Sequence, residues 1–116
     1  MLPTGKALKV SIYLSEGTVR HGVPCESAIL EFLFHRGVAG ASVFKGVAGF
    51  GSDHQLHTQS IVVLSDRLPI KVEFIETPAK VEELLPELKE LAATGMIEVQ
   101  ETTIVKAAGP AATPQD

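Results

Sequence analysis

The residues best suited to chemistry in this 116-residue chain gather in one glycine-rich segment, residues 49–58. In order, they are Gly49, Phe50, Gly51, Ser52, Asp53, His54, Gln55, Leu56, His57 and Thr58. Glycine lets backbone N–H groups approach an anion closely, while imidazole and carboxylate groups are metal ligands. After the glycines the segment has only Leu56 to bury. We therefore expect it to project from the core as a loop, where binding functions are common.

A metal site in this loop is one hypothesis. Asp53, His54 and His57 offer one carboxylate and two imidazoles, a ligand set found for zinc and copper. A convincing site needs both the right ligands and enough of them. The alternative is that His54 and His57 are solvated loop residues, and the sequence leaves both interpretations open.

Two further candidates precede the loop. Arg20 and His21 lie before an expected helix, whose N-terminal N–H groups would favour an anion; the alternative is a solvated turn. Cys25 lies near the same helix start, where a thiol pKa is lowered, or it is a small core or surface residue. No nucleophile, base and orienting group can be assembled, so we expect no catalytic residue and no enzyme activity.

Composition narrows the class of protein. The net charge of −4 and the absence of any Lys/Arg block argue against nucleic-acid binding. The single cysteine excludes an intramolecular disulfide, and no apolar run is long enough for membrane insertion. We expect a cytoplasmic protein with one domain, residues 1–106, followed by a disordered tail, residues 107–116.

Hydrophobic periodicity divides the domain into strands and helices. Alternating or short apolar runs predict strands. The expected strands are residues 7–14, 40–47, 61–64, 68–76 and 96–106, and residues 15–23, which contain two glycines, are predicted to be a connection.

Two helices are expected between these strands. The first covers residues 24–36 and begins on a proline. The second opens at Thr77 and Pro78, a hydroxyl cap followed by proline, and ends at Gly95. Its apolar stripe continues on both sides of Pro86, so we expect a kink there.

The resulting order predicts an α+β, ferredoxin-like βαββαβ sandwich. Right-handed crossovers would place both helices on one face of a four-stranded sheet. The other face would be bare, and a bare face in a small domain favours association between subunits. We therefore expect a homotrimer or another oligomer with the loop projecting from it.

Four motifs follow one another along the chain: Arg36-Gly37-Val38-Ala39-Gly40, Gly49-Phe50-Gly51, Leu68-Pro69-Ile70-Lys71-Val72-Glu73 and Thr94-Gly95. In this order they resemble the PII signal-transduction proteins. A second set consists of Arg20-His21-Gly22, Pro24, Gly49-Phe50-Gly51, Leu56-His57-Thr58 and Leu68-Pro69-Ile70. By this set the chain is still more similar to the PII-like family named domain of unknown function 190, and the resemblance covers residues 7–106.

The resemblance implies a trimer with adenine nucleotides bound in clefts between subunits. The ligand-binding residues it implies, with the nearest basic candidates added, are Gly49, Phe50, Gly51, Thr94, Gly95, Lys71 and Arg20. Met96 replaces the lysine of the family's pattern, and the Gly-Asp-Gly turn after Gly95 is missing. With fewer cations, we expect AMP or ADP to bind at least as well as ATP, with little help from Mg²⁺.

The leading hypothesis is therefore a PII-like regulatory protein whose loop engages a partner, either a membrane transporter or an enzyme. The partner-loop residues would be Ser52, Asp53, His54, Leu56, His57 and Thr58. Two alternatives remain: a metal-binding protein of the same fold that uses His54 and His57, and a structural trimer without an effector.

Overall fold

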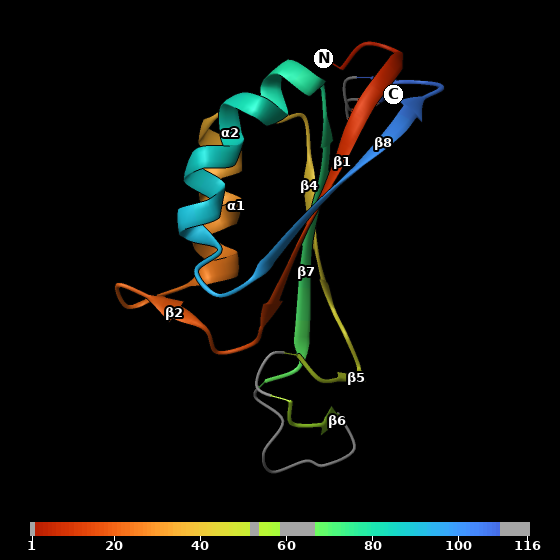
Figure 1. Cartoon of the computed structure of the whole chain (residues 1–116). Coiled ribbons are helices and arrows are strands. Elements are labelled where there is room, and N and C mark those ends of the chain that lie inside the picture. Colours follow the sequence, from red (N-terminus) through yellow and green to blue (C-terminus); the bar gives the residue numbers. More distant parts are fainter. Residues whose placement is uncertain (1, 52–53, 59–66, 110–116) are drawn as a thin grey trace, which may run out of the picture.

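The computed structural model describes residues 2–51, 54–58 and 67–109. Two helices lie on one face of a four-stranded antiparallel sheet (Figure 1). The helices are α1 (Cys25–His35) and α2 (Pro78–Leu91), and the strands, in spatial order, are β4 (Ala41–Lys45), β7 (Pro69–Glu76), β1 (Gly5–Ser15) and β8 (Met96–Ile104). This arrangement confirms the expected ferredoxin-like α+β fold. The strand predicted at residues 61–64 and residues 110–116 of the predicted tail lie outside the described residues.

The core forms between the helices and one face of the sheet, as the alternation of β1 and β7 predicts. Register places Val10 opposite Phe74 and Ile12 opposite Val72, with all four side chains buried. The residues that complete this core from the helices are Ile29, Leu33, Val81, Leu84 and Leu88. Burying such side chains contributes roughly 1.5–3 kcal/mol each, so this contact is the main source of the domain's stability.

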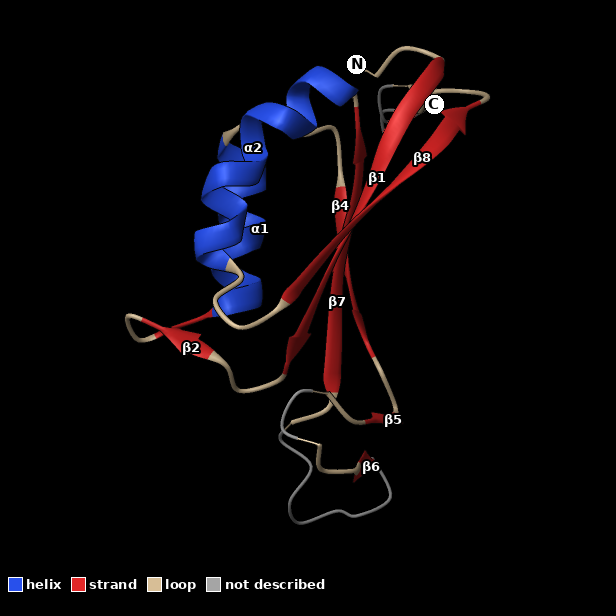
Figure 2. Cartoon of the chain, viewed as in Figure 1, coloured by secondary structure: helices blue, strands red, loops and turns tan. Residues whose placement is uncertain are grey.

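The start of α2 follows the predicted cap. Thr77 Oγ1 accepts a hydrogen bond from the Lys80 N–H at 3.3 Å, and Pro78 occupies the first helical position. The helix remains continuous through Pro86, and its ribbon changes direction after the first turns (Figure 2). The proline ring crowds the carbonyl four residues earlier, which accounts for a bend on that side of Pro86.

The predicted connection after β1 contains a small hairpin, which was not predicted from the sequence. Strands β2 (Val19–Arg20) and β3 (Val23–Pro24) pair around a two-residue turn. His21 and Gly22 have φ of 52° and 79° there, as a type I′ turn requires. Cys25, rather than Pro24, is the first residue of α1, because Pro24 is extended, with ψ of 135°, where it pairs with Val19. The Cys25 N–H donates to the Thr18 carbonyl at 3.0 Å and closes the hairpin.

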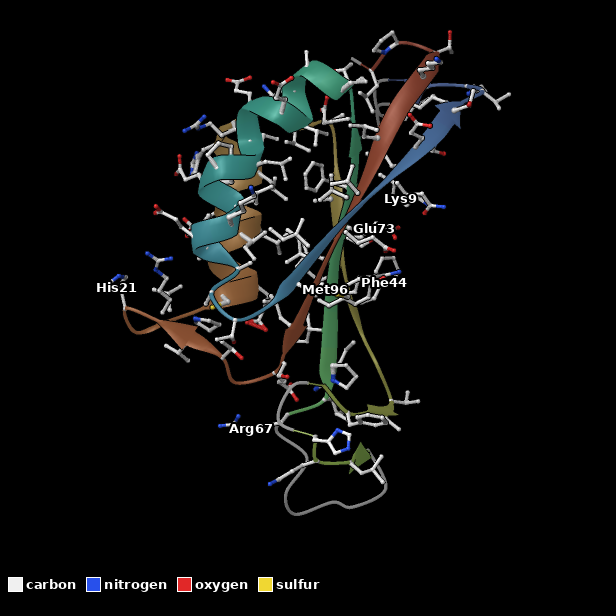
Figure 3. The ribbon with its side chains drawn as sticks, viewed as in Figure 1. Lys9, His21, Phe44, Arg67, Glu73 and Met96 are labelled. Atoms are coloured by element: carbon white, nitrogen blue, oxygen red, sulfur yellow. The ribbon has the colours of Figure 1, made fainter. Side chains whose placement is uncertain are left out.

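The second face of the sheet carries no helix of the described part of the chain. Along one row, Phe44 lies opposite Lys71, Lys71 opposite Tyr13, and Tyr13 opposite Met96. Phe44 and Met96 are 49% and 60% exposed. Figure 3 shows Phe44 on the side of the sheet away from the helices. We call these four residues the open-face row.

Candidate functional site

A cavity of about 380 Å³ lies at the end of the sheet where the loop leaves it. Three segments line it: the two ends of the loop, the end of β1 with the turn after it, and the turn between α2 and β8. The lining residues used below are Gly49, Phe50, Gly51, Arg67, Pro69, Tyr13, Thr18, Thr94, Gly95 and Met96. The structure thus brings together the two sets predicted to bind a ligand, Gly49 to Gly51 and Thr94 with Gly95, within a single chain.

Close packing on Pro69 fixes the loop end of the cavity. The Gly46 N–H donates to the Pro69 carbonyl at 2.7 Å. A Cβ atom at Gly46 would lie 2.7 Å from Pro69 Cγ, and one at Gly49 would lie 3.0 Å from it. Both positions therefore favour glycine because a side chain would push the proline ring away. We call Gly46, Gly49 and Pro69 the loop base.

Gly95 fixes the opposite wall. A Cβ atom there would lie 2.6 Å from the Tyr13 carbonyl oxygen and 2.6 Å from Leu14 Cδ2. The Gly95 N–H already donates to the Ala92 carbonyl at 2.8 Å, so in this conformation it is not free to bind an anion. Gly95 serves to bring the chain close under β1, which aligns Thr94 and Met96 along the cavity.

Arg67 is the one cationic residue among the described residues that line the cavity. Figure 3 shows it beside the projecting loop. The other named walls are mostly apolar or uncharged: Phe50 is 61% exposed and Met96 is 60% exposed. Thr18 Oγ1 donates to the Ser15 carbonyl at 2.8 Å, so that hydroxyl helps to hold the turn after β1. The cavity therefore combines apolar walls with one positive charge.

The two basic residues predicted to bind a ligand lie elsewhere. Lys71 is on the open face, where Nζ is 3.2 Å from Glu73 Oε1 and 5.1 Å from the centre of the Phe44 ring. Arg20 donates to the Glu90 carbonyl and lines a separate groove between the hairpin and the two helices. Neither lines the cavity, and their assignment to ligand binding remains a prediction.

The described part of the loop makes one small ladder. Strands β5 (Ala48–Gly49) and β6 (His57–Thr58) pair, with Gly49 opposite His57. The His54 N–H donates to the Gly51 carbonyl at 2.8 Å, and its ring packs edge-on against Phe50 with centroids 5.2 Å apart. The His54 ring therefore packs against Phe50, which lines the cavity.

The predicted metal site is not assembled in the described residues, where no group of three His, Cys, Asp or Glu side chains could hold a metal ion. Ser52 and Asp53 lie outside those residues. The metal hypothesis consequently gains no support from the ligands that the structure places.

Cys25 is a core residue, 1% exposed. Burial raises the pKa of its thiol above the ordinary value of 9.0, and the neighbouring Glu26 carboxylate raises that pKa further. The alternative of a thiol pKa lowered at the helix N-terminus was therefore wrong. Desolvation of the thiolate outweighs the favourable charge of Arg20.

Within the described ranges, the structure contains no helix with the length and apolar character needed to cross a membrane.

Comparison with known proteins shows the family to which this chain belongs. Residues 7–104 match the model of DUF190, a family described as Uncharacterized ACR. The chain belongs to the DUF190 family. A UPF0166 protein of Aquifex aeolicus is 30% identical over 94 residues, covering 81% of this chain and 89% of the relative. A UPF0166 protein of Methanocaldococcus jannaschii is 30% identical over 102 residues, covering 87% and 94%.

Solved structures show the same fold as this DUF190 chain. CPII, a nitrogen regulatory PII-like protein from Thiomonas intermedia K12 with ADP, AMP and bicarbonate bound, superimposes with a TM-score of 0.67. The match covers 91% of this chain and 94% of CPII at 18% identity. The apo form of CPII superimposes with a TM-score of 0.58, also at 18% identity.

Sequence reasoning missed Arg67 and Tyr13 as cavity residues of the DUF190 chain. Arg67 directly precedes the Leu68-Pro69-Ile70 motif, so it stands where the loop re-enters the sheet. Tyr13 was assigned only to the polar face of β1. The topology offered a signal for both residues, because β1 ends and β7 begins at the same end of the sheet as the loop base.

Proposed function

We propose that this DUF190 protein is a PII-like regulatory protein without enzyme activity. A small anionic effector, an adenine nucleotide such as AMP or ADP, occupies the cavity, and the loop engages a partner protein. The observation that carries this proposal is the single cavity shared by Gly49, Phe50 and Gly51 from the loop and Thr94 and Gly95 from the turn before β8. The nucleotides named for CPII, which shares the fold, support it.

The cavity suits a ligand of nucleotide type. Its volume of about 380 Å³ falls in the range of ordinary small-molecule sites, roughly 300–1,000 Å³. Tyr13, Phe50 and Met96 offer apolar and aromatic surface for a planar ring. Arg67 offers a fork of N–H donors that fits phosphate or carboxylate oxygens. Such a site combines apolar contact with one anion-binding group.

The same composition argues for fewer phosphates. With one cation among the described lining residues, each phosphate beyond the first is desolvated with little compensation. AMP or ADP should therefore bind at least as well as ATP, and the described residues that line the cavity include no Asp or Glu to hold Mg²⁺. We accordingly propose that Mg²⁺ adds little to binding.

The loop is proposed as the partner-binding element. Leu56 and Phe50 are 74% and 61% exposed, and exposed apolar side chains on a projecting segment are suited to bury against another protein. Because Phe50 also lines the cavity and contacts His54, an effector that touches Phe50 would alter the surface offered to the partner. The proposed partner is a membrane transporter or an enzyme in the cytoplasm.

Association into a homotrimer belongs to the same proposal. The open-face row exposes aromatic and aliphatic surface beside the paired charges of Lys71 and Glu73. Tyr13 and Met96 belong both to this row and to the cavity. A second subunit packed on the open face would therefore lie beside the effector site and help to enclose it.

Isothermal titration calorimetry tests the effector. Purified protein is titrated with AMP, ADP and ATP, each with and without Mg²⁺, and separately with Zn²⁺ and Cu²⁺. We expect saturable binding of AMP or ADP with an affinity at least equal to that of ATP. A tenfold preference for ATP, about 1.4 kcal/mol, would contradict the proposed site. Binding of metal without nucleotide would favour the metal-binding alternative, and binding of neither would favour a structural trimer.

A further inference from the structure

The sheet holds the main chain next to Arg67, and the Arg67 side chain is exposed. On its C-terminal side, Leu68 is 2% exposed and its carbonyl accepts the Glu16 N–H at 2.9 Å. Pro69 follows and is held by the loop base. The Arg67 side chain itself is exposed at the cavity wall. The sheet therefore anchors the backbone of Arg67 and leaves its guanidinium group available to a ligand.

Four other cations of the described chain have protein partners. Arg36 lies 2.9 Å from Glu87 and Lys45 lies 2.7 Å from Glu16, while Lys71 and Arg20 make the contacts described above. Within the described residues, no ion pair or hydrogen bond joins Arg67 to another group. A guanidinium with no partner among the described residues, beside apolar walls, is available for a bidentate contact with an anion.

Met96 lines the cavity from the start of β8, and Figure 3 shows it on the sheet, apart from Arg67 beside the loop. It begins β8, pairs with Tyr13 across the ladder, and is 60% exposed. Its unbranched thioether offers soft, adaptable contact with a ring and no charge. A ligand thus meets a cation at one end of the lining and an apolar surface at the other.

We infer that Arg67 is the anion-binding residue of the cavity, and that the uncharged Met96 leaves phosphates beyond the first without a second cation. This inference rests on the proposed function and adds the orientation of the ligand. The phosphate of a nucleoside monophosphate lies at Arg67, and its base lies against Tyr13, Phe50 and Met96. A second or third phosphate has no cationic partner among the described lining residues.

The first test compares a charged ligand with its neutral counterpart. AMP and adenosine are titrated by calorimetry into the wild-type protein and into Arg67→Gln. We expect Arg67→Gln to weaken AMP binding about tenfold or more, because a charge-assisted contact is lost, and to leave adenosine binding unchanged. Arg67→Lys should recover part of the AMP affinity, since a lysine keeps the charge but not the fork.

Arg36→Gln is the matched control. It makes the same chemical change at a residue that lines the groove between the helices rather than the cavity. This variant should bind AMP like the wild type. Circular dichroism melting of all variants verifies that each is folded at the titration temperature.

The second test adds charge at Met96. The side chain is exposed and unbranched, so Met96→Lys requires no repacking of the core. We expect this variant to gain affinity for ADP and ATP by about fivefold to tenfold relative to AMP, because the added phosphates acquire a cationic partner. Met96→Gln, with similar size and no charge, should show no such gain.

The outcomes separate the inference from the proposed function. If the wild type binds AMP but Arg67→Gln binds it equally well, Arg67 is not the anion-binding residue and the proposed function survives. Equal loss of adenosine and AMP affinity in Arg67→Gln would also overturn the inference, because it would indicate a structural role. If the wild type binds no adenine nucleotide, the proposed function fails and the orientation inferred from it fails with it.

Discussion

Substituting Gly95 by alanine should destabilise the protein by compressing the turn under β1. The new Cβ atom would lie 2.6 Å from the Tyr13 carbonyl oxygen, 2.6 Å from Leu14 Cδ2 and 3.0 Å from the Ala92 carbonyl oxygen. Leu14 can yield only by repacking, because it is 7% exposed in the core. The Tyr13 carbonyl belongs to the backbone of a strand paired on both sides and cannot move alone.

The magnitude follows from two opposing effects. Overpacking of this kind costs about 1–3 kcal/mol. Alanine also restricts the unfolded chain more than glycine does, which returns about 0.4–1 kcal/mol. We therefore expect Gly95→Ala to lower the free energy of unfolding by about 1–2 kcal/mol, or the Tm by roughly 4–8 °C for a domain of this size.

Urea unfolding followed by circular dichroism, at one fixed protein concentration, measures the effect. Gly40→Ala is the control, because a Cβ atom there meets nothing within 4 Å. That variant should be as stable as the wild type or slightly more stable. If Gly95→Ala unfolds at the same urea concentration as Gly40→Ala, the close approach under β1 does not constrain residue 95 and the reasoning is refuted.

Three other predictions follow from the fold and the core. Light scattering at micromolar concentration should give about three times the chain mass of 12.3 kDa; a monomer would contradict the proposed trimer. Replacing residues 52–58 by a short Gly-Ser link should cost less than about 2 kcal/mol of stability, and a larger loss would show that the loop is packed. The Cys25 thiol should resist a thiol reagent at pH 8 until the protein unfolds. Folding raises the pKa of the Cys25 thiol, so its contribution to stability is fully present below about pH 9 and is lost as the pH rises further. Unfolding measured at pH 8 and pH 10, with Cys25→Ala as the control, would show this loss of stability.

Patterns local in sequence were sufficient for most of the fold. The alternation through Val10 and Ile12 reflects a strand with one buried face, and the Thr77 hydroxyl satisfies an N–H that any helix must leave unpaired. Both signals act over a few residues, so the sequence shows them directly. The hairpin at His21 was missed because its turn has histidine, not the usual asparagine or glycine, at the first position with positive φ.

The candidate site could be predicted only in part. Gly49 and Gly95 are visible in the sequence because glycine marks places where the chain approaches itself closely. Arg67 was not identified, since its role depends on the sheet register that returns β7 to the loop base beside the end of β1. Lys71 shares a face of the sheet with Tyr13, its partner in the ladder, but its ammonium group is paired with Glu73 and lies over the Phe44 ring. These contacts are made in the folded sheet and could not be predicted from the sequence.

The loop base has a consequence for how such a chain can diversify. Gly46 and Gly49 meet the Pro69 ring, so the outgoing and returning chain segments are held together before the loop begins. Residues beyond that junction can be lengthened, shortened or exchanged without shifting the register of β4 on β7, because the closure cost of a longer loop grows only slowly with its length. A lineage can therefore exchange one loop for another while the sheet, and the cavity beside it, remain as they are. The same junction offers a protein engineer a place to insert a foreign peptide.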